Sequence, residues 1–307
     1  MNAIEVFCPG SVANISCGFD ILGLCLDSIG DTMRVKKVSK KGITIKSISG
    51  YNLSLKTNEN AAGVSALALI DQYKDIDYGF EIEIIKKIKP GSGIGSSAAS
   101  ASGSVFAINE LLGKPFSKKE LVKFALDGEY ICSKSYHADN ISPLIFGGIT
   151  LVRDHKELDI VNLPTPSELY VTIIHPQIEI KTSDSRSIID RNIHISKMIE
   201  QSANLGAFIS SLYEEDYELL KRSIKDVIIE PYRSELIPEF KNLKKIALKN
   251  NALGFGISGS GPSMFSLCKG VKSANSVIEN MEYHLDKMGI NYKSYISKIN
   301  KQGLKIL

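Results

Sequence analysis

Residues 90–100 have the composition of a loop that binds an anion. Their sequence is Pro-Gly-Ser-Gly-Ile-Gly-Ser-Ser-Ala-Ala-Ser, with glycines at the alternate positions 91, 93 and 95. Glycine has no Cβ and tolerates positive φ, so alternate glycines can turn several backbone N–H groups toward one point. A helix that starts after the loop would add its unpaired N–H groups and the positive end of its dipole. The stretch therefore predicts an anion site, and phosphate is the anion that suits it.

The neighbouring segments predict a strand before this loop and a helix after it. Residues 80–88 begin with apolar residues alternating with glutamates, the pattern of a strand with one buried face. Residues 96–112 are rich in small residues and helix formers, and Gly113 follows them, as is typical of a helix C-terminus. The predicted order is strand, glycine loop, helix.

Glycine spacing alone does not identify what the loop holds. The loop is not a Walker A loop, because no Gly-Lys-Ser/Thr follows it. It also fails as a Rossmann fingerprint, because no third glycine stands at the required spacing. A tight structural turn between a strand and a helix remains an alternative interpretation.

A second helix is predicted to begin after Ser117. The sequence Ser-Lys-Lys-Glu at 117–120 is a capping box, and the apolar residues that follow lie on one arc of the helix. At 100° per residue Glu129 falls inside that arc, where a carboxylate requires a cation or a hydrogen-bond donor. The alternative is that the helix ends near Gly128 and leaves Glu129 exposed.

Composition and charge exclude several classes of protein. The 307 residues exceed the size at which single cores stop growing, about 250–300 residues, so two lobes are expected. The net charge of +3 is dispersed and Trp is absent, which argues against a nucleic-acid partner. No apolar stretch of about 18 residues and no signal peptide occur, so we expect no membrane partner and a cytoplasmic location. The five cysteines form no CxxC pair, which argues against a zinc site and a disulfide framework.

A domain break is predicted near residues 162–167, where two prolines precede a strand-like segment at 169–174. We therefore divide the chain into residues 1–163 and 164–307. In the second part we expect helices at about 196–212, 214–229 and 238–250, a glycine-rich segment at 254–261, a strand at 263–268, and one more helix and strand. The mixture of helices and strands in both parts predicts an α+β protein whose two lobes enclose a cleft.

The full string at 90–100 resembles the ATP-binding loop of the GHMP kinases, named for galactose, homoserine, mevalonate and phosphomevalonate. Their motif is P-x-x-x-G-L-G-S-S-A, and Ile94 stands here where Leu is usual. Two other family motifs occur in the expected order, at 9–23 and 254–263, so the resemblance spans essentially the whole chain. It implies a two-lobed GHMP-kinase fold, with an N-terminal ribosomal-protein-S5-like α/β lobe, a C-terminal ferredoxin-like α+β lobe and the active site in the cleft. The residues it assigns to ATP are Pro90, Gly91, Ser92, Gly93, Ile94, Gly95, Ser96, Ser97, Ala98, Ala99 and Ser100.

The segment 9–23 resembles the N-terminal motif of the homoserine-kinase branch, P-x-S/T-x-A-N-x-x-x-G-F-D-x-L-G. The resemblance implies ATP-dependent phosphorylation of L-homoserine to O-phospho-L-homoserine, in threonine biosynthesis, by a homodimer. An amino-acid substrate requires an anion for its ammonium group and a cation for its carboxylate, and Asp20 suits the first. The segments 182–186 and 230–238 resemble the regions that supply arginines to this pocket, which nominates Arg186 and Arg233.

By resemblance, His137 and Asn140 line the amino-acid site, with Asn140 near the reacting hydroxyl. His137 could otherwise be a structural histidine. The residues expected to bind substrate are Asn14, Asp20, His137, Asn140, Thr182, Arg186 and Arg233.

The expected mechanism lacks a carboxylate base. Related mevalonate-type kinases place an aspartate near the attacking hydroxyl, whereas the homoserine-kinase pattern has Asn140 there, and an amide cannot take a proton. Asp139 is adjacent and is the alternative base. We expect direct in-line attack on the γ-phosphate, with catalytic roles for Asn14, Asn140 and Arg186. Ser97 and Glu129 are the expected Mg²⁺ ligands.

Two rival functions stay open at this point. A GHMP-fold kinase of another small alcohol, of the shikimate or mevalonate type, would carry the same loop but needs no site for an ammonium group. A non-catalytic nucleotide-binding or RNA-binding relative is the other rival, because the sequence pI is about 8.4.

Overall fold

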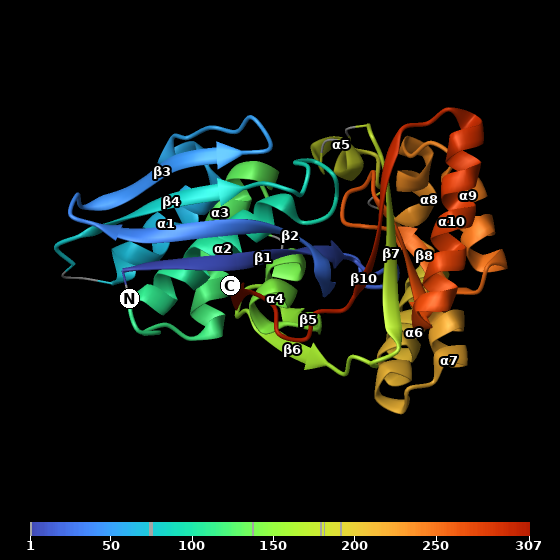
Figure 1. Cartoon of the computed structure of the whole chain (residues 1–307). Helices are drawn as coiled ribbons and strands as arrows, with labels where there is room; N and C mark the ends of the chain where they lie inside the picture. Colours follow the sequence, from blue (N-terminus) through green and yellow to red (C-terminus); the bar gives the residue numbers. More distant parts are fainter. Residues whose placement is uncertain (1, 74–75, 137, 179, 181, 191) are drawn as a thin grey trace.

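The computed structural model describes residues 2–73, 76–136, 138–178, 180, 182–190 and 192–307. Two β-sheets with helices packed against them lie side by side (Figure 1). The first sheet has seven strands in the order β11-β1-β2-β4-β3, with β5 paired to the start of β2 and β6 paired to β5. Its strands are β1 (Ala3–Ala13), β2 (Leu22–Val38), β3 (Gly42–Ser49), β4 (Gly79–Ile85), β5 (Ile149–Asp154), β6 (Asp159–Leu163) and β11 (Lys305–Ile306).

Four strands form the second sheet in the order β10-β7-β9-β8. They are β7 (Leu169–Pro176), β8 (Ala252–Ile257), β9 (Met264–Lys269) and β10 (Tyr292–Lys298). Helices connect β7 to β8 and β9 to β10, and the spatial order 4-1-3-2 of these strands is the split βαβ arrangement of ferredoxin-like folds. The predicted α+β class with a ferredoxin-like second lobe is confirmed.

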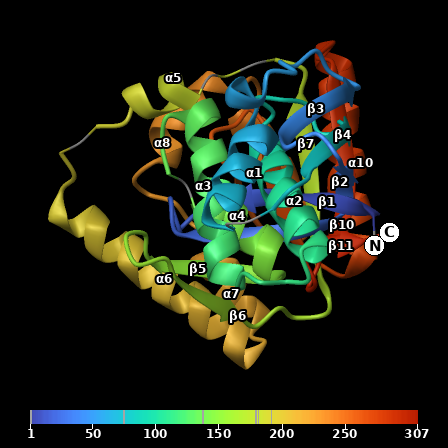
Figure 2. The ribbon, with the colours of Figure 1, turned by 90° about the vertical axis from the view of Figure 1, so that its left-hand side faces the viewer.

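Helices cover one face of the first sheet, as Figures 1 and 2 both show. They are α1 (Ala61–Gln72), α2 (Ser96–Leu111), α3 (Lys118–Ser133) and α4 (Ala138–Phe146), and a short 3₁₀ turn at Thr57–Glu59 precedes α1. The predicted strand, loop and helix around residues 90–100 are therefore β4, the glycine loop and α2.

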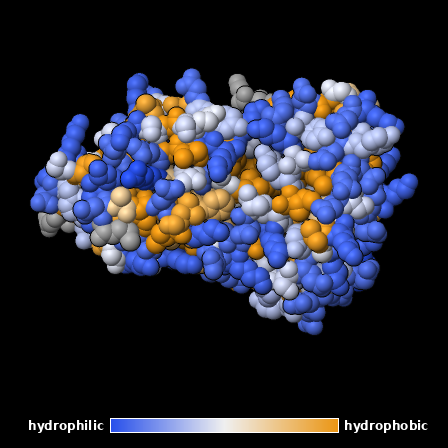
Figure 3. Space-filling view, in the orientation of Figure 1, coloured by the Kyte–Doolittle hydropathy of each residue, from blue (hydrophilic) through white to orange (hydrophobic). Residues whose placement is uncertain are grey.

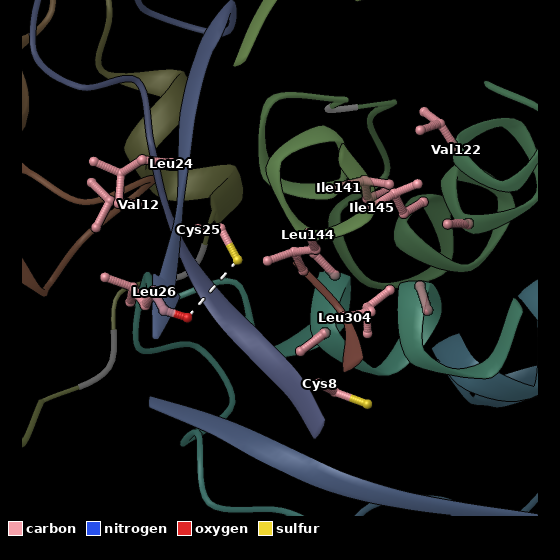
Figure 4. Close-up of a cluster of buried hydrophobic side chains, with 14 of the residues drawn as sticks. Cys8, Val12, Leu24, Cys25, Leu26, Val122, Ile141, Leu144, Ile145 and Leu304 are labelled. Carbon is pink, nitrogen blue, oxygen red and sulfur yellow. Dashed lines mark hydrogen bonds between the residues drawn. The ribbon is translucent and has the colours of Figure 1, made fainter. Parts of the chain in front are cut away.

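The hydrophobic core of this lobe joins the sheet to α4 and to the chain terminus. Figure 4 shows Cys25 of β2 pointing toward Ile141 and Leu144 of α4 and toward Leu304, while Leu24 points to the other side of the strand. All five are at most 5% exposed. Burying each such aliphatic side chain contributes about 1.5–3 kcal/mol, so this core fixes α4 against β2.

Helix α3 begins as predicted and continues past the point where it could have ended. Ser117 accepts a hydrogen bond from the backbone of Glu120, whose carboxylate accepts one from the Ser117 backbone. The helix runs to Ser133, so Glu129 lies in its interior and is 6% exposed. The alternative in which the helix stops near Gly128 is wrong.

The second part of the chain contains six helices among the described residues. They are α5 (Thr182–Ser187), α6 (Ile195–Glu214), α7 (Tyr217–Ser223), α8 (Glu230–Arg233), α9 (Phe240–Lys249) and α10 (Gly270–Met288), with a 3₁₀ turn at Ser234–Leu236. Figure 2 shows α6 along the outer side of the molecule.

The predicted helix at 214–229 is wrong in its second half, because α7 ends at Ser223. The carboxylate of Asp226 accepts hydrogen bonds from the backbone N–H groups of Ile228, Ile229 and Glu230. This local capping competes with continuation of the helix and starts α8 instead.

The chain crosses from the first sheet to the second between β6 and β7, where we propose the boundary between residues 1–163 and 164–307. The last residues return to the first sheet, since β11 pairs with β1 and Asn300 donates its backbone N–H to Cys25. The second part is thereby fastened to the first at its C-terminal end.

The surface is mixed in character. Figure 3 shows small hydrophobic patches among hydrophilic residues, over the first sheet and at the junction of the two sheets. No helix in the described ranges combines the length and apolar character that crossing a membrane requires. All five cysteines are unpaired, and Cys132 is the one that is exposed.

Candidate active site

A cavity of about 510 Å³ lies between the glycine loop, α3, α4 and the second lobe. The predicted site residues that line it are Asn14, Asp20, Pro90, Gly91, Ser92, Gly93, Gly95, Ser96, Ser97, Ser100, Glu129, Asn140, Arg186 and Arg233. The structure thus brings together residues that are up to 219 positions apart, from Asn14 to Arg233.

The glycine loop has the backbone conformation that its composition predicts. Gly91, Gly93 and Gly95 have φ values of 71°, 81° and 68°, the left-handed region that favours glycine. Gly95 directly precedes α2, so the unpaired N–H groups of that helix lie at the end of the loop, where Gly95, Ser96 and Ser97 line the cavity. A Cβ on Gly95 would lie 2.1 Å from Ser11 Oγ, which shows how closely the N-terminal motif packs behind the loop.

The second glycine-rich segment holds the loop from the other lobe. Ser258 donates its hydroxyl to Gly93 O at 2.7 Å, and Ser263 donates its backbone N–H to Ser92 O at 3.1 Å. Gly259 donates its N–H to Ala13 O at 3.2 Å. The three motifs recognised in the sequence therefore meet at one place.

Part of the predicted ATP segment faces the core instead of the cavity. The side chains of Ile94, Ala98 and Ala99 are at most 2% exposed and belong to the hydrophobic core of the first lobe. These side chains anchor the loop and α2, so any contact they make with a nucleotide has to come from their backbone.

A buried ion pair beneath the loop was not predicted. Lys86 pairs with Asp31 and donates to Ser96 O at 2.9 Å and to Ser100 Oγ at 3.1 Å. The other oxygen of Asp31 accepts the backbone N–H groups of residues 87 and 88. Both charged side chains are 1% exposed, and the network ties β2, the end of β4 and the first turn of α2 together.

Ser97 and Glu129 lie together at one end of the cavity. The hydroxyl of Ser97 and the carboxyl of Glu129 form a hydrogen bond. Burial raises the pKa of Glu129 to about 6, although the hydrogen bond with Ser97 lowers this pKa. A carboxylate and a hydroxyl at a phosphate loop fit a hard cation such as Mg²⁺. No group of three or more His, Cys, Asp or Glu side chains suited to a metal occurs in the described part of the chain, so phosphate and water would have to complete the coordination.

Asp20, Arg186 and Arg233 lie at the other end. Arg186 Nη2 donates to both carboxylate oxygens of Asp20, at 2.8 and 2.7 Å.

Arg233 is 4% exposed and donates to Ser185 O at 3.1 Å and Gly259 O at 3.0 Å. Both guanidinium groups lie near the ring of Phe19, at 5.6 and 4.9 Å from its centroid. Burial lowers the pKa of Arg233 to about 10. The nearby charge of Asp20 raises this pKa, and the nearby charge of Arg186 lowers it. The guanidinium group of Arg233 is therefore charged at pH 7.

Asn14 and Asn140 connect the two ends. Asn14 accepts the backbone N–H of Asp20 at 2.9 Å and donates to Gly259 O at 2.7 Å. Asn140 Oδ1 accepts the Ser11 hydroxyl at 2.8 Å, which leaves its NH₂ as the group that can donate into the cavity. An amide held in this way orients an oxygen and cannot remove a proton.

Asp139 also lines the cavity, although the sequence nominated it only as an alternative base. It is 2% exposed, and its carboxyl group accepts the backbone N–H groups of Asp139 and Asn140. Burial raises the pKa of Asp139 to about 8, and the negative charges of Asp20 and Glu129 add to the rise. Its carboxyl group is therefore mainly protonated at pH 7 when the cavity holds no ligand.

For two of the predicted site residues, the structure does not describe the side chain. His137 lies outside the described residues. Thr182 begins α5, and its side chain lies outside the described part. The ion pair of Lys86 and Asp31 gave no sequence signal beyond a lysine placed just before the glycine loop.

Two family models match the chain. The GHMP kinases N terminal domain matches residues 60–148, and the GHMP kinases C terminal domain matches residues 208–287. The homoserine kinase of Chlorobium phaeobacteroides strain BS1 is 37% identical over 320 aligned positions that cover 100% of both chains. The homoserine kinase of Xylella fastidiosa strain M12 is 33% identical over 307 positions, covering 99% of this chain and 94% of the relative.

Solved structures agree with these matches. The homoserine kinase of Cytophaga hutchinsonii has a TM-score of 0.96 at 43% identity, covering 100% of this chain and 98% of that one. The L. major mevalonate kinase in complex with R-mevalonate has a TM-score of 0.73 at 14% identity, with 95% of each chain covered. The match to the mevalonate kinase shows a shared fold and nothing more.

Proposed function

The chain belongs to the homoserine kinases of the GHMP kinase family, and on this premise we propose that it transfers the γ-phosphate of ATP to the hydroxyl group of L-homoserine. The products are ADP and O-phospho-L-homoserine, an intermediate in threonine biosynthesis. The observation that carries the proposal is a single cavity with a phosphate-type loop at one end and paired charges suited to an amino acid at the other.

The loop at 90–100 and the N-terminus of α2 supply the N–H donors for the ATP phosphates. Ser97 and Glu129 would hold Mg²⁺, which neutralises negative charge on the β- and γ-phosphates when it is bound. Support for this role comes from the Ser97–Glu129 hydrogen bond and the burial of Glu129 beside the loop. Lys86 fixes the first turn of α2 from below the loop.

The amino-acid end recognises the two charged groups of homoserine. Arg233 is a buried cation with donors directed along the cavity wall, so it suits the substrate carboxylate. Arg186 lies beside it on the same aromatic ring and adds positive charge. For Asp20 to take the ammonium group, as its motif implies, its ion pair with Arg186 has to open or share its oxygens.

Transfer proceeds by direct in-line attack of the homoserine hydroxyl on the γ-phosphate. Asn140 lies near the loop through its bond to Ser11 and can donate to the hydroxyl or to a phosphate oxygen. Asn14, Asn140 and Arg186 align the hydroxyl and stabilise the charge that develops, and alignment and charge stabilisation are what a loose phosphoryl-transfer transition state requires. Dimer formation and a cytoplasmic location stay predictions.

A coupled assay for ADP release with ATP, Mg²⁺ and one acceptor at a time tests this function. The acceptors are L-homoserine, shikimate, mevalonate and galactose. We expect kcat/KM for homoserine to exceed the others by at least about 100-fold, because a buried ionic group left without its partner costs several kcal/mol. A higher kcat/KM for mevalonate or shikimate would assign the chain to another alcohol, and nucleotide binding with no transfer would indicate a non-catalytic protein.

A further inference from the structure

Helix α6 is covered on one side and carries large apolar side chains on the other. On the covered side, which packs against α7 and β6, the buried residues are Phe208, Ser211 and Leu212. On the other side the exposed large side chains are Ile195 at 57%, Met198 at 51%, Ile199 at 61% and Tyr213 at 61%. Figure 2 shows α6 along the outer side of the molecule, where a second molecule can reach it.

The uncovered side forms a continuous stripe without charge, which we call the outer face of α6. At about 100° per residue its members fall within an arc of roughly 80°. They are Ile195, Ile199, Ser202, Gly206, Ile209 and Tyr213. The charged residues of the helix, Lys197, Glu200 and Glu214, all fall outside this arc. A helix side that meets only water normally carries charged residues, so the outer face has the character of a contact surface.

Gly206 lies in the middle of the outer face and meets no need within the chain. No described atom beyond its own part of the helix lies within 4 Å of a Cβ built on it. Glycine in a helix interior destabilises the helix relative to alanine. Its use there is explained when another backbone approaches closely. Gly206 therefore suits the closest point of contact with a partner helix.

The rotation of α6 about its own axis is fixed by Gln201. Its side chain donates to Cys17 O at 3.1 Å and accepts the backbone N–H of Val227 at 2.9 Å. These bonds tie α6 to the N-terminal motif and to the segment before α8. The outer face is therefore held toward solvent.

The two halves of the outer face match each other. In an antiparallel pair of α6 helices centred on residue 204, Ser202 of one copy lies level with Gly206 of the other, so small residues meet at the centre. Toward the ends, the positions that lie level are Ile199 with Ile209 and Ile195 with Tyr213. A two-fold interface requires this self-complementarity, whereas a partner of different sequence does not.

Charge also favours a second copy as the occupant. The chain carries a net charge of +3, so two copies repel each other at long range. A contact without charged side chains adds nothing to this repulsion. From these observations we propose that the outer face of α6 is an interface between two copies of the chain, whose α6 helices pack antiparallel about a two-fold axis level with residue 204. The proposal concerns this surface and does not depend on the reaction that the cavity performs.

Sedimentation velocity of the full chain between about 0.1 and about 100 µM measures the dimer dissociation constant. We expect Gly206→Leu to raise this constant by about 100-fold or more, because the new side chain holds the two helices apart. Glu200→Leu is the matched control, since it places the same side chain at an exposed position of α6 outside the outer face. It should change the constant by less than about 3-fold.

The thermal midpoint separates loss of contact from loss of folding. It is measured at a concentration where the proteins are monomeric. Gly206→Leu should not lower it there, because leucine is the better helix former and has space within the monomer.

A pair of charges tests the antiparallel register. Ile195→Glu and Tyr213→Lys should each raise the dissociation constant by about 10-fold or more. Together they place opposite charges level with each other across the interface, so the double variant should dimerise more tightly than either single variant, by about 3-fold or more. Within one chain the two positions are about 27 Å apart along the helix, too far for contact.

Four results would overturn the proposal. A chain that stays monomeric at the highest concentration has no such interface. A dimer that Gly206→Leu leaves intact uses another surface. Equal weakening by Glu200→Leu would mean that the outer face is not specific. A double variant that dimerises no better than the single variants would exclude the antiparallel arrangement.

Discussion

Arg186 donates from one nitrogen to both carboxylate oxygens of Asp20, at 2.8 and 2.7 Å, and so joins α5 of the second lobe to the N-terminal motif of the first. The two side chains are 35% and 29% exposed, so the pair lies at the mouth of the cavity and not in its depths. Arg233 lies further inside, on the same Phe19 ring.

The Arg186–Asp20 pair should act as one unit. Asp20→Asn and Arg186→Gln are each expected to raise KM for homoserine. Expressed as a free energy, the effect of the double variant on KM should be smaller than the sum of the effects of the two single variants. A coupling of about 0.5–3 kcal/mol is typical of residues in contact. Steady-state kinetics on the four proteins give this value. Strict additivity would mean that the two side chains act independently.

Arg233→Ala is expected to raise KM for homoserine by about 30-fold or more with a smaller effect on kcat, because it removes the buried cation that suits the carboxylate. Arg153→Ala is the control, since Arg153 is exposed and its partner Asp159 is too. Unchanged homoserine kinetics in Arg233→Ala would refute the carboxylate assignment.

Glu129→Gln should weaken the binding of Mg²⁺. Gln keeps the shape of Glu129 but loses the charge, so the Mg²⁺ concentration for half-maximal rate should rise by roughly 10-fold or more. KM for homoserine should change little, because Glu129 lies at the Ser97 end of the cavity. A Mg²⁺ titration at saturating ATP measures the effect. An unchanged midpoint would remove Glu129 from the metal site.

Gly95→Ala should impair ATP binding. The new Cβ would lie 2.1 Å from Ser11 Oγ at a φ of 68°. Gly113→Ala is the matched control, because Gly113 also has positive φ, 86°, but nothing lies within 4 Å of its Cβ. We expect Gly113→Ala to lower the free energy of unfolding by about 1 kcal/mol and to leave the kinetics unchanged. Gly95→Ala should lower stability too, and it should also raise KM for ATP. Equal kinetics for the two variants would show that the close approach at Gly95 is unimportant.

Asp31→Ala should destabilise the protein by about 3–5 kcal/mol, because it leaves the buried charge of Lys86 without its counter-ion. Asp159→Ala breaks the exposed pair with Arg153 and should cost less than about 1 kcal/mol. Urea denaturation of both variants measures the difference. Similar midpoints would mean that Lys86 finds another partner.

Local sequence patterns predicted the elements that position the site. The capping box at Ser117 and the helical arc placed Glu129 inside α3, and alternating residues placed a strand before the glycine loop. These patterns are local, since each depends on residues a few positions apart. The family motifs then indicated which distant segments share the cleft.

Tertiary contacts were not predictable in this way. Asp31 lies within a long strand and Lys86 follows another, and only the pairing of Thr32 with Ile85 in the sheet brings the two charges beside each other. A charged residue in a strand otherwise suggests the solvent face. The burial of Asp139 likewise depends on contact between α4 and β2, which no spacing in the sequence shows.

The most direct test of the account identifies the product of the reaction. Phosphorus NMR of the protein with ATP, Mg²⁺ and L-homoserine should show one new phosphomonoester, coupled to the side-chain methylene protons, in equal amount to ADP. The signal should be absent when homoserine is omitted. ADP with free phosphate and no ester, or an ester formed only when another alcohol replaces homoserine, would contradict the account.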